Sequence, residues 1–224
     1  MKITFLGTGA ADWNRQDHST WPGFRRNASV LIDDILLIDP GPDVPDALVA
    51  FGKDPKNVQH IINTHKHSDH YSPETLAFLS HSVFTELEAG EECQVGPYQI
   101  QALPANHATC AKTVHFIISD GKKRIFYGLD GAWLLYDEYR AIRNAGIDLA
   151  VIDATIGFVD GDFRIFEHNN LNMVLEMKKT LDPWVRRWCI SHMARTLHTD
   201  HDTLSATMAT YGVETAFDGF VLSV

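Results

Sequence analysis

His65-Lys66-His67-Ser68-Asp69-His70 is the densest group of potential metal ligands in the chain. It follows Val58 to Asn63, an apolar run that predicts a buried strand. Imidazole and carboxylate are ligands for divalent metals of borderline hardness, and their spacing lets one loop reach two ions. A polar loop that happens to contain histidines is the alternative, but three His and one Asp within six residues argue against it. We therefore predict a metal-binding loop.

Composition narrows the class of protein. At 224 residues the chain is long enough for a real core, and we expect a single domain over residues 1–224. The net charge of −10 argues against a polynucleotide partner but allows a small anionic substrate beside bound cations. No apolar run approaches the length of a membrane span. The apolar stretch in Met1 to Gly9 is too short for a signal peptide, and the three scattered cysteines imply no disulfide framework. A cytoplasmic protein is the expectation.

Hydrophobic patterning predicts strands and helices throughout the chain. Strands are expected at 2–6, 28–32, 35–39, 58–63, 82–86, 92–95, 98–103, 113–119, 123–128, 147–152, 186–190 and 214–224. Helices are expected at 43–51, from Ser72 to about Ser80, and at 136–145, 170–180 and 200–211. Residues 11–27 and 154–167 are expected to be loops. This order predicts an α/β (α+β) fold in which sheets pack together and helices cover them outside.

Three more candidate ligands follow the ends of expected strands. They are His107, Asp130 and His192. Taken singly, each is also explained by a surface histidine, an Asp-Gly turn or a helix cap. Their common position at strand ends, beside the loop at 65–70, favours one shared site.

The order of these motifs resembles the metallo-β-lactamase superfamily. The resemblance runs from Ile35-Leu36-Leu37-Ile38-Asp39-Pro40-Gly41 through the HxHxDH motif at 65–70 to the three later residues. It implies a four-layer αββα sandwich with two divalent metal ions at one edge of the sheets. By that resemblance His65, His67 and His107 hold one metal, Asp69, His70 and His192 hold the other, and Asp130 bridges them. Asp39 matches a position whose carboxylate orients a metal-bound histidine, although a strand-ending Asp before a turn explains it equally well.

Within the superfamily the chain is most similar to two branches, the small phosphodiesterases typified by the phosphonate-pathway cyclic phosphodiesterase and the tRNA 3′-processing endonucleases. The similar segments are Phe5 to Ala10, Arg25 to Ser29 and His168-Asn169-Asn170. The resemblance gives His168 a role at the scissile phosphate or the leaving group; a plain loop histidine is the alternative. The tRNA enzymes' basic arm is missing, because residues 69–107 are short and acidic. The structural zinc site of the phosphonate-pathway enzyme is also missing, because residues 11–27 contain no Cys.

These features predict a dinuclear metal-dependent hydrolase acting on a small or cyclic phosphodiester. Asp69 and Asp130 would accept the proton of the attacking water, and His168 would assist the leaving oxygen. A lactone or carboxylic-ester hydrolase on the same site is the first alternative, and a non-catalytic metal-binding protein is the second. Zinc suits the His-rich ligand set, and manganese or iron would also be accepted. Members of the superfamily often dimerise, so a homodimer is a further expectation.

Other polar and aromatic residues near these motifs have two readings. Arg25 and Arg26 would bind a second anionic group of the substrate, or, as we favour, carry solvated loop charges. His198 and His201 would line the pocket or belong to a helix start capped by Thr199 or Asp200. The loop tryptophans Trp13, Trp21 and Trp133 are expected to wall the site, and Trp184 and Trp188 to lie in the core.

Overall fold

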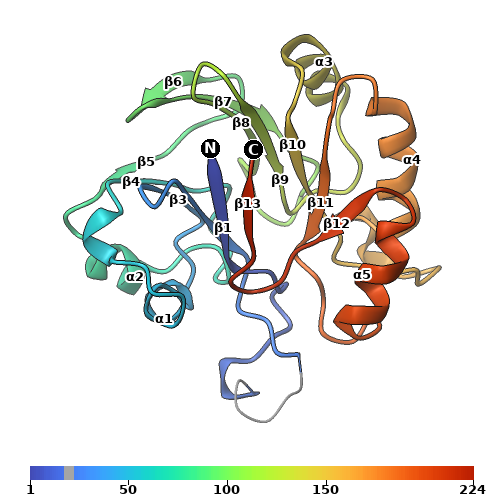
Figure 1. Ribbon diagram of the computed structural model, residues 1–224, viewed down its shortest axis with the longest axis horizontal. Helices are drawn as coiled ribbons and strands as arrows, with labels where there is room; N and C mark the ends of the chain where they lie inside the picture. The colour runs from blue at the N-terminus through green and yellow to red at the C-terminus, as the bar shows by residue number, and fades with distance from the viewer. Residues whose placement is uncertain (18–22) are drawn as a thin grey trace.

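Two β-sheets packed face to face form the centre of the computed structural model, which describes residues 1–17 and 23–224 (Figure 1). The six-stranded sheet has the order β13-β1-β2-β3-β4-β5. Its strands are β1 (Lys2–Gly7), β2 (Ser29–Ile32), β3 (Leu36–Ile38), β4 (His60–Ile62), β5 (Val83–Thr85) and β13 (Val221–Ser223). The seven-stranded sheet has the order β12-β11-β10-β9-β8-β7-β6. Its strands are β6 (Glu92–Val95), β7 (Tyr98–Pro104), β8 (Val114–Ser119), β9 (Arg124–Gly128), β10 (Leu149–Asp153), β11 (Trp188–Ser191) and β12 (Val213–Thr215).

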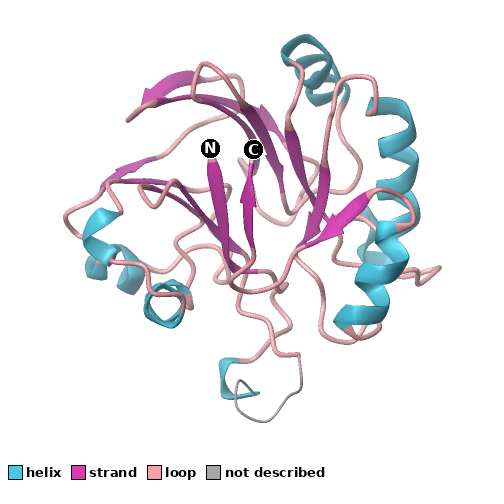
Figure 2. Cartoon of the chain, viewed as in Figure 1, coloured by secondary structure: helices cyan, strands magenta, loops and turns pink. Residues whose placement is uncertain are grey.

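Helices cover the outer faces of both sheets (Figure 2). The six-stranded sheet carries α1 (Val44–Ala50) and α2 (Pro73–Phe78), and the seven-stranded sheet carries α3 (Tyr136–Ala145), α4 (Leu171–Leu181) and α5 (His201–Ala209). Short 3-10 helices lie at η1 (Arg15–Asp17), η2 (Pro55–Asn57) and η3 (Phe163–Phe166). The expected αββα sandwich is confirmed. None of the described helices is long and apolar enough to cross a membrane.

Three hydrophobic clusters hold the layers together. The central cluster lies between the sheets and includes Phe5, Phe116 and Tyr127, each fully buried. The other two clusters lie between each sheet and its own helices, which is why the strands are apolar on both faces. Trp188 is buried in the cluster under α3 to α5, and Trp184 packs against it, as expected for core tryptophans.

The parallel parts of the two sheets place several polar loops at one edge. Strands β9 to β12 run parallel in one sheet, and β3 to β5 run parallel in the other. Because the carboxyl ends of parallel strands meet at one edge, the residues that follow β3, β4, β9, β10 and β11 emerge there. These residues are Asp39, the loop at 65–70, Asp130, Asp153 and His192.

Local turns and caps agree with the sequence. Asp33 and Asp34 both have positive φ (50° and 63°), the backbone of a two-residue hairpin turn between β2 and β3. The Ser72 side chain accepts a hydrogen bond from the Thr75 backbone N–H and so caps α2, with Pro73 as its first residue.

The expectation of one strand over 214–224 is wrong. The chain pairs as β12 with β11 in one sheet, crosses over, and pairs as β13 with β1 in the other. Gly219, with φ of +87°, turns the chain between the two and donates its N–H to Phe5 O at 2.8 Å. Both strands are short and apolar in alternation, so the sequence pattern is the same as that of one longer strand.

Candidate metal centre

The loop at 65–70 is held tightly against the turn that follows β3. The chain folds back on itself around Asp69, since both His70 N–H and Tyr71 N–H donate to His67 O, at 3.0 and 2.9 Å. Gly41 makes the approach possible, because a Cβ at that position would lie 2.2 Å from Asp69 O. The Pro-Gly-Pro segment after β3 is therefore part of the support of the ligand loop.

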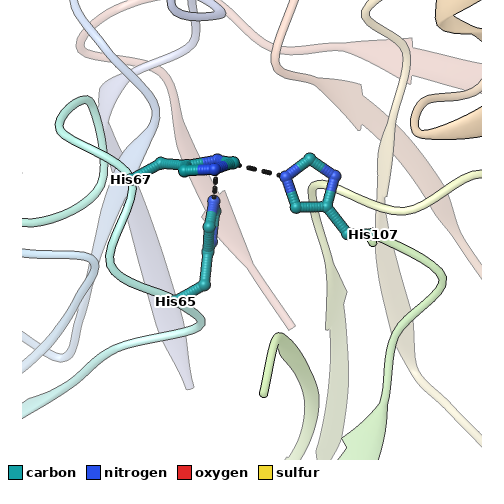
Figure 3. A group of neighbouring side chains, drawn as sticks. All are labelled: His65, His67 and His107. Carbon is teal, nitrogen blue, oxygen red and sulfur yellow. Dashed lines mark hydrogen bonds between the residues drawn. The ribbon is translucent and has the colours of Figure 1, made fainter. Parts of the chain in front are cut away.

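Three histidines form the first group of candidate ligands. His67 lies between His65 on the same loop and His107 from the loop after β7 (Figure 3). His67 Nδ1 is 3.0 Å from His65 Nε2 and 3.1 Å from His107 Nε2. A tetrahedral site with metal–nitrogen distances of about 2.0 Å places neighbouring donor atoms about 3.3 Å apart. The three nitrogens therefore converge as ligands of one ion would.

A second group of candidate ligands lies beside the first. His70 Nε2 is 3.2 Å from His192 Nε2 and 3.3 Å from Asp69 Oδ2. Asp130 reaches both groups: its Oδ2 is 2.7 Å from His70 Nε2, and its Oδ1 is 4.0 Å from His107 Nε2. The structure thus brings together all seven residues that the sequence singled out as ligands.

Asp130 provides the test of whether this donor set fits metal ions. Its side chain is buried, and Oδ2 faces the Nε2 atoms of two candidate ligands, His70 at 2.7 Å and His192 at 3.2 Å. A buried carboxylate oxygen is costly unless it is paired or coordinates a metal. Because the oxygen sits where the two groups of donors meet, the residues fit a pair of divalent cations bridged by Asp130.

The protonation states of the histidines also fit metal binding. Burial lowers the pKa of His65 to about 3 and lowers the pKa of His107, so both imidazoles are neutral, the form that coordinates a metal. Burial also opposes charge on His70 and His192, but the surrounding carboxylates, Asp130 foremost, outweigh it. The pKa of His192 rises to about 10, and that of His70 also rises. A cation held by these carboxylates would take the place of those protons.

Hydrogen bonds behind the histidines set which ring nitrogen faces the site. Asp39 Oδ2 accepts from His70 Nδ1 at 2.9 Å, so Asp39 lies behind a candidate ligand, as the resemblance implied. Thr155 Oγ1 is 2.7 Å from His192 Nδ1, and Glu167 Oε2 is 3.2 Å from His107 Nδ1. Such partners fix the tautomer that leaves Nε2 free to coordinate.

Backbone strain concentrates at the same edge. Asp39, Asp130 and His192 have φ of 62°, 58° and 62°, the left-handed region that non-glycine residues rarely adopt. Each of the three directly follows a strand or lies within two residues of its end. Conformations of this kind persist at functional sites, where the surrounding structure holds them in place.

His168 stands next to the two groups and is held by Asp153. His168 Nδ1 is 3.0 Å from Asp153 Oδ2 and 3.1 Å from Thr155 Oγ1. Burial disfavours charge on His168, but the Asp153 and Asp130 carboxylates outweigh it and raise its pKa above the usual 6.5. Nε2 of His168 has no partner among the described residues, and the side chain lines the pocket over the candidate ligands.

The pocket has a volume of about 250 Å³. Besides candidate ligands and His168, its lining includes Asp12, Thr109 and Arg164. No tryptophan of the described residues lines it, so the expectation of a tryptophan wall is wrong for Trp13 and Trp133, and Trp21 lies outside the described residues. Trp13 instead donates from Nε1 to Met193 O at 2.8 Å and lines a neighbouring cavity.

The residues that sequence reasoning missed are those that hold the candidate ligands. Asp153 is the last residue of β10, and Asp130 lies two residues after β9, so the strand-end rule applied to every strand of the sheet would have found Asp153. The sequence carried no such signal for Glu167 and Thr155. Each contacts a candidate ligand from a loop, and only the fold determines the path of that loop.

The two arginines and two histidines left open by the sequence have structural partners. Arg25 is buried, and the Arg26 side chain is 14% exposed with its Nη1 3.6 Å from Asp218 Oδ2, so neither is a solvated loop charge. Asp200 accepts from the Thr203 N–H and caps α5, as one reading predicted. His198 Nε2 lies 2.7 Å from Ala154 O, behind the pocket wall.

Comparisons with known proteins agree with this architecture. A family model described as the metallo-beta-lactamase superfamily matches residues 22–72. Two curated UPF0173 proteins, from Pyrococcus furiosus and Pyrococcus abyssi, are 29% identical over a 109-residue alignment that covers 40% of this chain. The match spans about half (49%) of the length of each relative.

Solved structures are similar over the whole chain. Zn²⁺-bound PqqB from Methylobacterium extorquens has a TM-score of 0.74 at 16% identity, with 100% of both chains covered. Human tRNase Z, short form, has a TM-score of 0.75 at 17% identity, covering 100% of this chain and 99% of that one. A diphosphatase from the PhnP family has a TM-score of 0.72 at 17% identity, covering 99% of this chain and 97% of that one. The resemblance inferred from the motifs is confirmed at the level of the fold.

Proposed function

Because the chain has the metallo-β-lactamase fold with a convergent His/Asp cluster at its edge, we propose that it is a metal-dependent hydrolase of small or cyclic phosphodiesters. The observation that carries the proposal is the His168–Asp153 pair, 3.0 Å apart, beside the candidate ligands. A metal site alone serves many hydrolases. A proton donor held next to it suits a substrate whose leaving group departs as a poorly stabilised oxyanion.

Two groups of residues would hold the metal ions. His65, His67 and His107 would bind one divalent cation, Asp69, His70 and His192 would bind the other, and Asp130 would lie between them. Such a pair of cations supplies an activated water near neutral pH and stabilises charge on the phosphoryl oxygens. Zinc is the metal that the histidine-rich donors favour, and the similar PqqB structure holds Zn²⁺.

The carboxylates have a separate task in this proposal. Asp69 and Asp130 lie within the ligand cluster, and hydrogen bonds and charge from His70 and His192 outweigh their burial and lower the pKa of each carboxyl group. Both are therefore ionised at neutral pH and able to accept a proton from the attacking water.

His168 would deliver the proton that the leaving group needs. Asp153 accepts from His168 Nδ1–H, which directs Nε2 to the pocket. Since the pKa of His168 is raised, a larger share of the ring is imidazolium near neutral pH than in a free histidine, and its Nε2–H can donate to the departing oxygen. Asp153 would keep the ring oriented and stabilise its charge.

The nature of the substrate rests on charge and size. The pocket is about 250 Å³, and the segment from Glu86 to Glu92 is acidic, which disfavours a long polyanion. Two of the similar structures are a tRNase Z and a diphosphatase, both named for phosphate chemistry. The two names support phosphate chemistry, and the pocket size and the acidic segment favour a small phosphodiester over a nucleic acid.

The test compares leaving groups in the variant His168→Ala. A diester that releases an alkoxide needs protonation, so kcat/KM should fall by about 10²–10⁴-fold. Bis(p-nitrophenyl) phosphate releases a stable phenolate, so the same variant should lose far less activity on it. Zinc content, measured in both proteins, controls for loss of the metals.

Three results would contradict the proposal. Equal losses on both diesters would mean that His168 does not act on the leaving group. Turnover of lactones or carboxylic esters, with every phosphodiester left intact, would identify the site as a carboxylic-ester hydrolase. Absence of any turnover in the metal-replete protein would favour a metal-binding role.

A further inference from the structure

Arg25 is a buried cation with no carboxylate in direct contact. Its side chain is 8% exposed, and it forms no direct ion pair with any described residue. Asp218 reaches it through Thr8, whose Oγ1 accepts from Arg25 Nη1 at 2.7 Å and donates to Asp218 Oδ1 at 2.8 Å, and burial lowers the pKa of the guanidinium. Buried charges in proteins are normally paired directly, so the guanidinium can take a further anionic partner.

The hydrogen bonds of Arg25 leave one side of the guanidinium open. Nη1 donates to Thr8 Oγ1 at 2.7 Å and to Ala216 O at 2.9 Å, and Nη2 lies 3.2 Å from His201 Nδ1. A guanidinium has five N–H groups, so Nε–H and one Nη2–H have no partner among the described residues. These two adjacent N–H groups are the pair that binds two oxygens of a carboxylate or phosphate side by side.

Arg25 lines a cavity of about 370 Å³. Arg195, His198 and His201 also line it, and Trp13 supplies an apolar wall. Asp200 is the acidic residue of the lining, and its carboxylate already accepts the Thr203 N–H that caps α5. The cavity is thus dominated by cationic and N–H-bearing side chains.

This cavity is separate from the metal pocket but adjoins it. Ala194, two residues after His192, lines both. Trp13 Nε1 donates to Met193 O and braces the segment between the two spaces. A ligand bound beside Arg25 would therefore lie across one strand end from the candidate metals.

We propose that Arg25 and the surrounding cavity form a binding site for an oxyanion, in chemical terms a phosphate group. The anion would receive the two free N–H groups of Arg25 and pair its buried charge. The phosphate would be either a free ion or a second phosphate carried by the substrate of the neighbouring pocket. The site is inferred from Arg25 and its cavity alone, so it does not depend on the proposed hydrolase activity.

His201 allows a test that keeps the shape of the site. In His201→Asp a carboxylate oxygen occupies the place of His201 Nδ1, 3.2 Å from Arg25 Nη2, and pairs the guanidinium from within the protein. His201→Asn puts a neutral oxygen in the same place and is the matched control. An acidic residue in the first turn of α5 also suits the helix dipole, so the aspartate variant should fold.

The measurement is calorimetric titration of the metal-loaded protein with inorganic phosphate. Phosphate at the metals gives a background that all variants share. We expect a second class of site in the wild type and in His201→Asn, weakened at least about tenfold in His201→Asp. Arg25→Gln should show the same loss if it folds. A wild type with only the metal-associated class, or equal isotherms for the aspartate and asparagine variants, would overturn the proposal.

A kinetic arm distinguishes the two sources of the phosphate. Phosphodiesters with and without a second phosphate group are compared in the two His201 variants. If the site holds part of the substrate, KM rises in His201→Asp only for the doubly phosphorylated compound. If it holds a free ion, the variant changes phosphate binding and leaves both KM values equal to those of His201→Asn.

Discussion

Replacing Asp39 by Asn changes one atom and should weaken one metal site. Asp39 is fully buried and acts only as an acceptor. Oδ1 accepts from the Thr64 N–H at 2.7 Å, from Thr64 Oγ1 at 2.9 Å and from Asn63 Nδ2 at 3.0 Å. Oδ2 accepts from His70 Nδ1 at 2.9 Å and from Tyr127 OH at 3.3 Å. Every neighbour donates, so an amide NH₂ must face a donor wherever it points.

The new amide will adopt whichever of its two orientations costs less free energy, and that orientation decides which hydrogen bonds are lost. An NH₂ in place of Oδ1 would face two N–H donors that cannot turn away. An NH₂ in place of Oδ2 faces the Tyr127 hydroxyl, which can rotate, and His70 Nδ1, which can lose its proton to Nε2. His70 Nε2 would then carry the proton where the candidate metal binds. Loss of such a carboxylate typically lowers metal affinity by about 10–100-fold, or about 1.4–2.7 kcal/mol.

Chelator competition with zinc, resolved into two sites, measures this effect. We expect the site of Asp69, His70 and His192 to weaken by that factor and the site of His65, His67 and His107 to stay as it was. Tyr127→Phe removes one donor to the same oxygen and keeps the carboxylate, so both affinities should be preserved. Unchanged affinities in Asp39→Asn, or an equal loss in Tyr127→Phe, would refute the reasoning.

Two further predictions concern the division of the ligands and the stability of the fold. Asp69→Ala should remove the second metal and most activity while the first site stays occupied, as metal analysis would show; retention of both metals would make the assignment wrong. The second concerns His115, fully buried with Nδ1 2.5 Å from Glu138 Oε1: burial opposes its charge, but Glu138 outweighs it and the pKa is raised. The raised pKa contributes stability that is fully present below the unfolded pKa of about 6.5. This contribution is lost as the pH rises through the folded pKa. Glu138→Gln keeps a side-chain acceptor for the Leu135 N–H, so the stability difference from wild type, measured by urea unfolding, should be larger at pH 6 than at pH 9; a constant difference would contradict this.

Much of the site was visible in the sequence because its first half is local. Four candidate ligands lie between His65 and His70, and a loop of that length can hardly avoid placing them together. His107, Asp130 and His192 are distant in sequence, but each follows an apolar strand, and parallel strands end at a common edge. The hydrophobic period of the strands and the position of each residue at a strand end therefore predicted the ligand set, although the sequence showed none of the contacts.

The chain's own sequence determined the candidate metal loop, the helix caps and the hairpin at Asp33–Asp34, because these depend on neighbours a few residues apart, and its hydrophobic periods indicated the layered fold. Tertiary structure alone decided which sheet each half of 214–224 joins, since alternation reports burial and not the partner strand. It also decided that Glu167 reaches His107 and that Arg25 is buried beside Ala216. These contacts span 60 and 191 residues of sequence, and no local pattern encodes where two loops so far apart will meet.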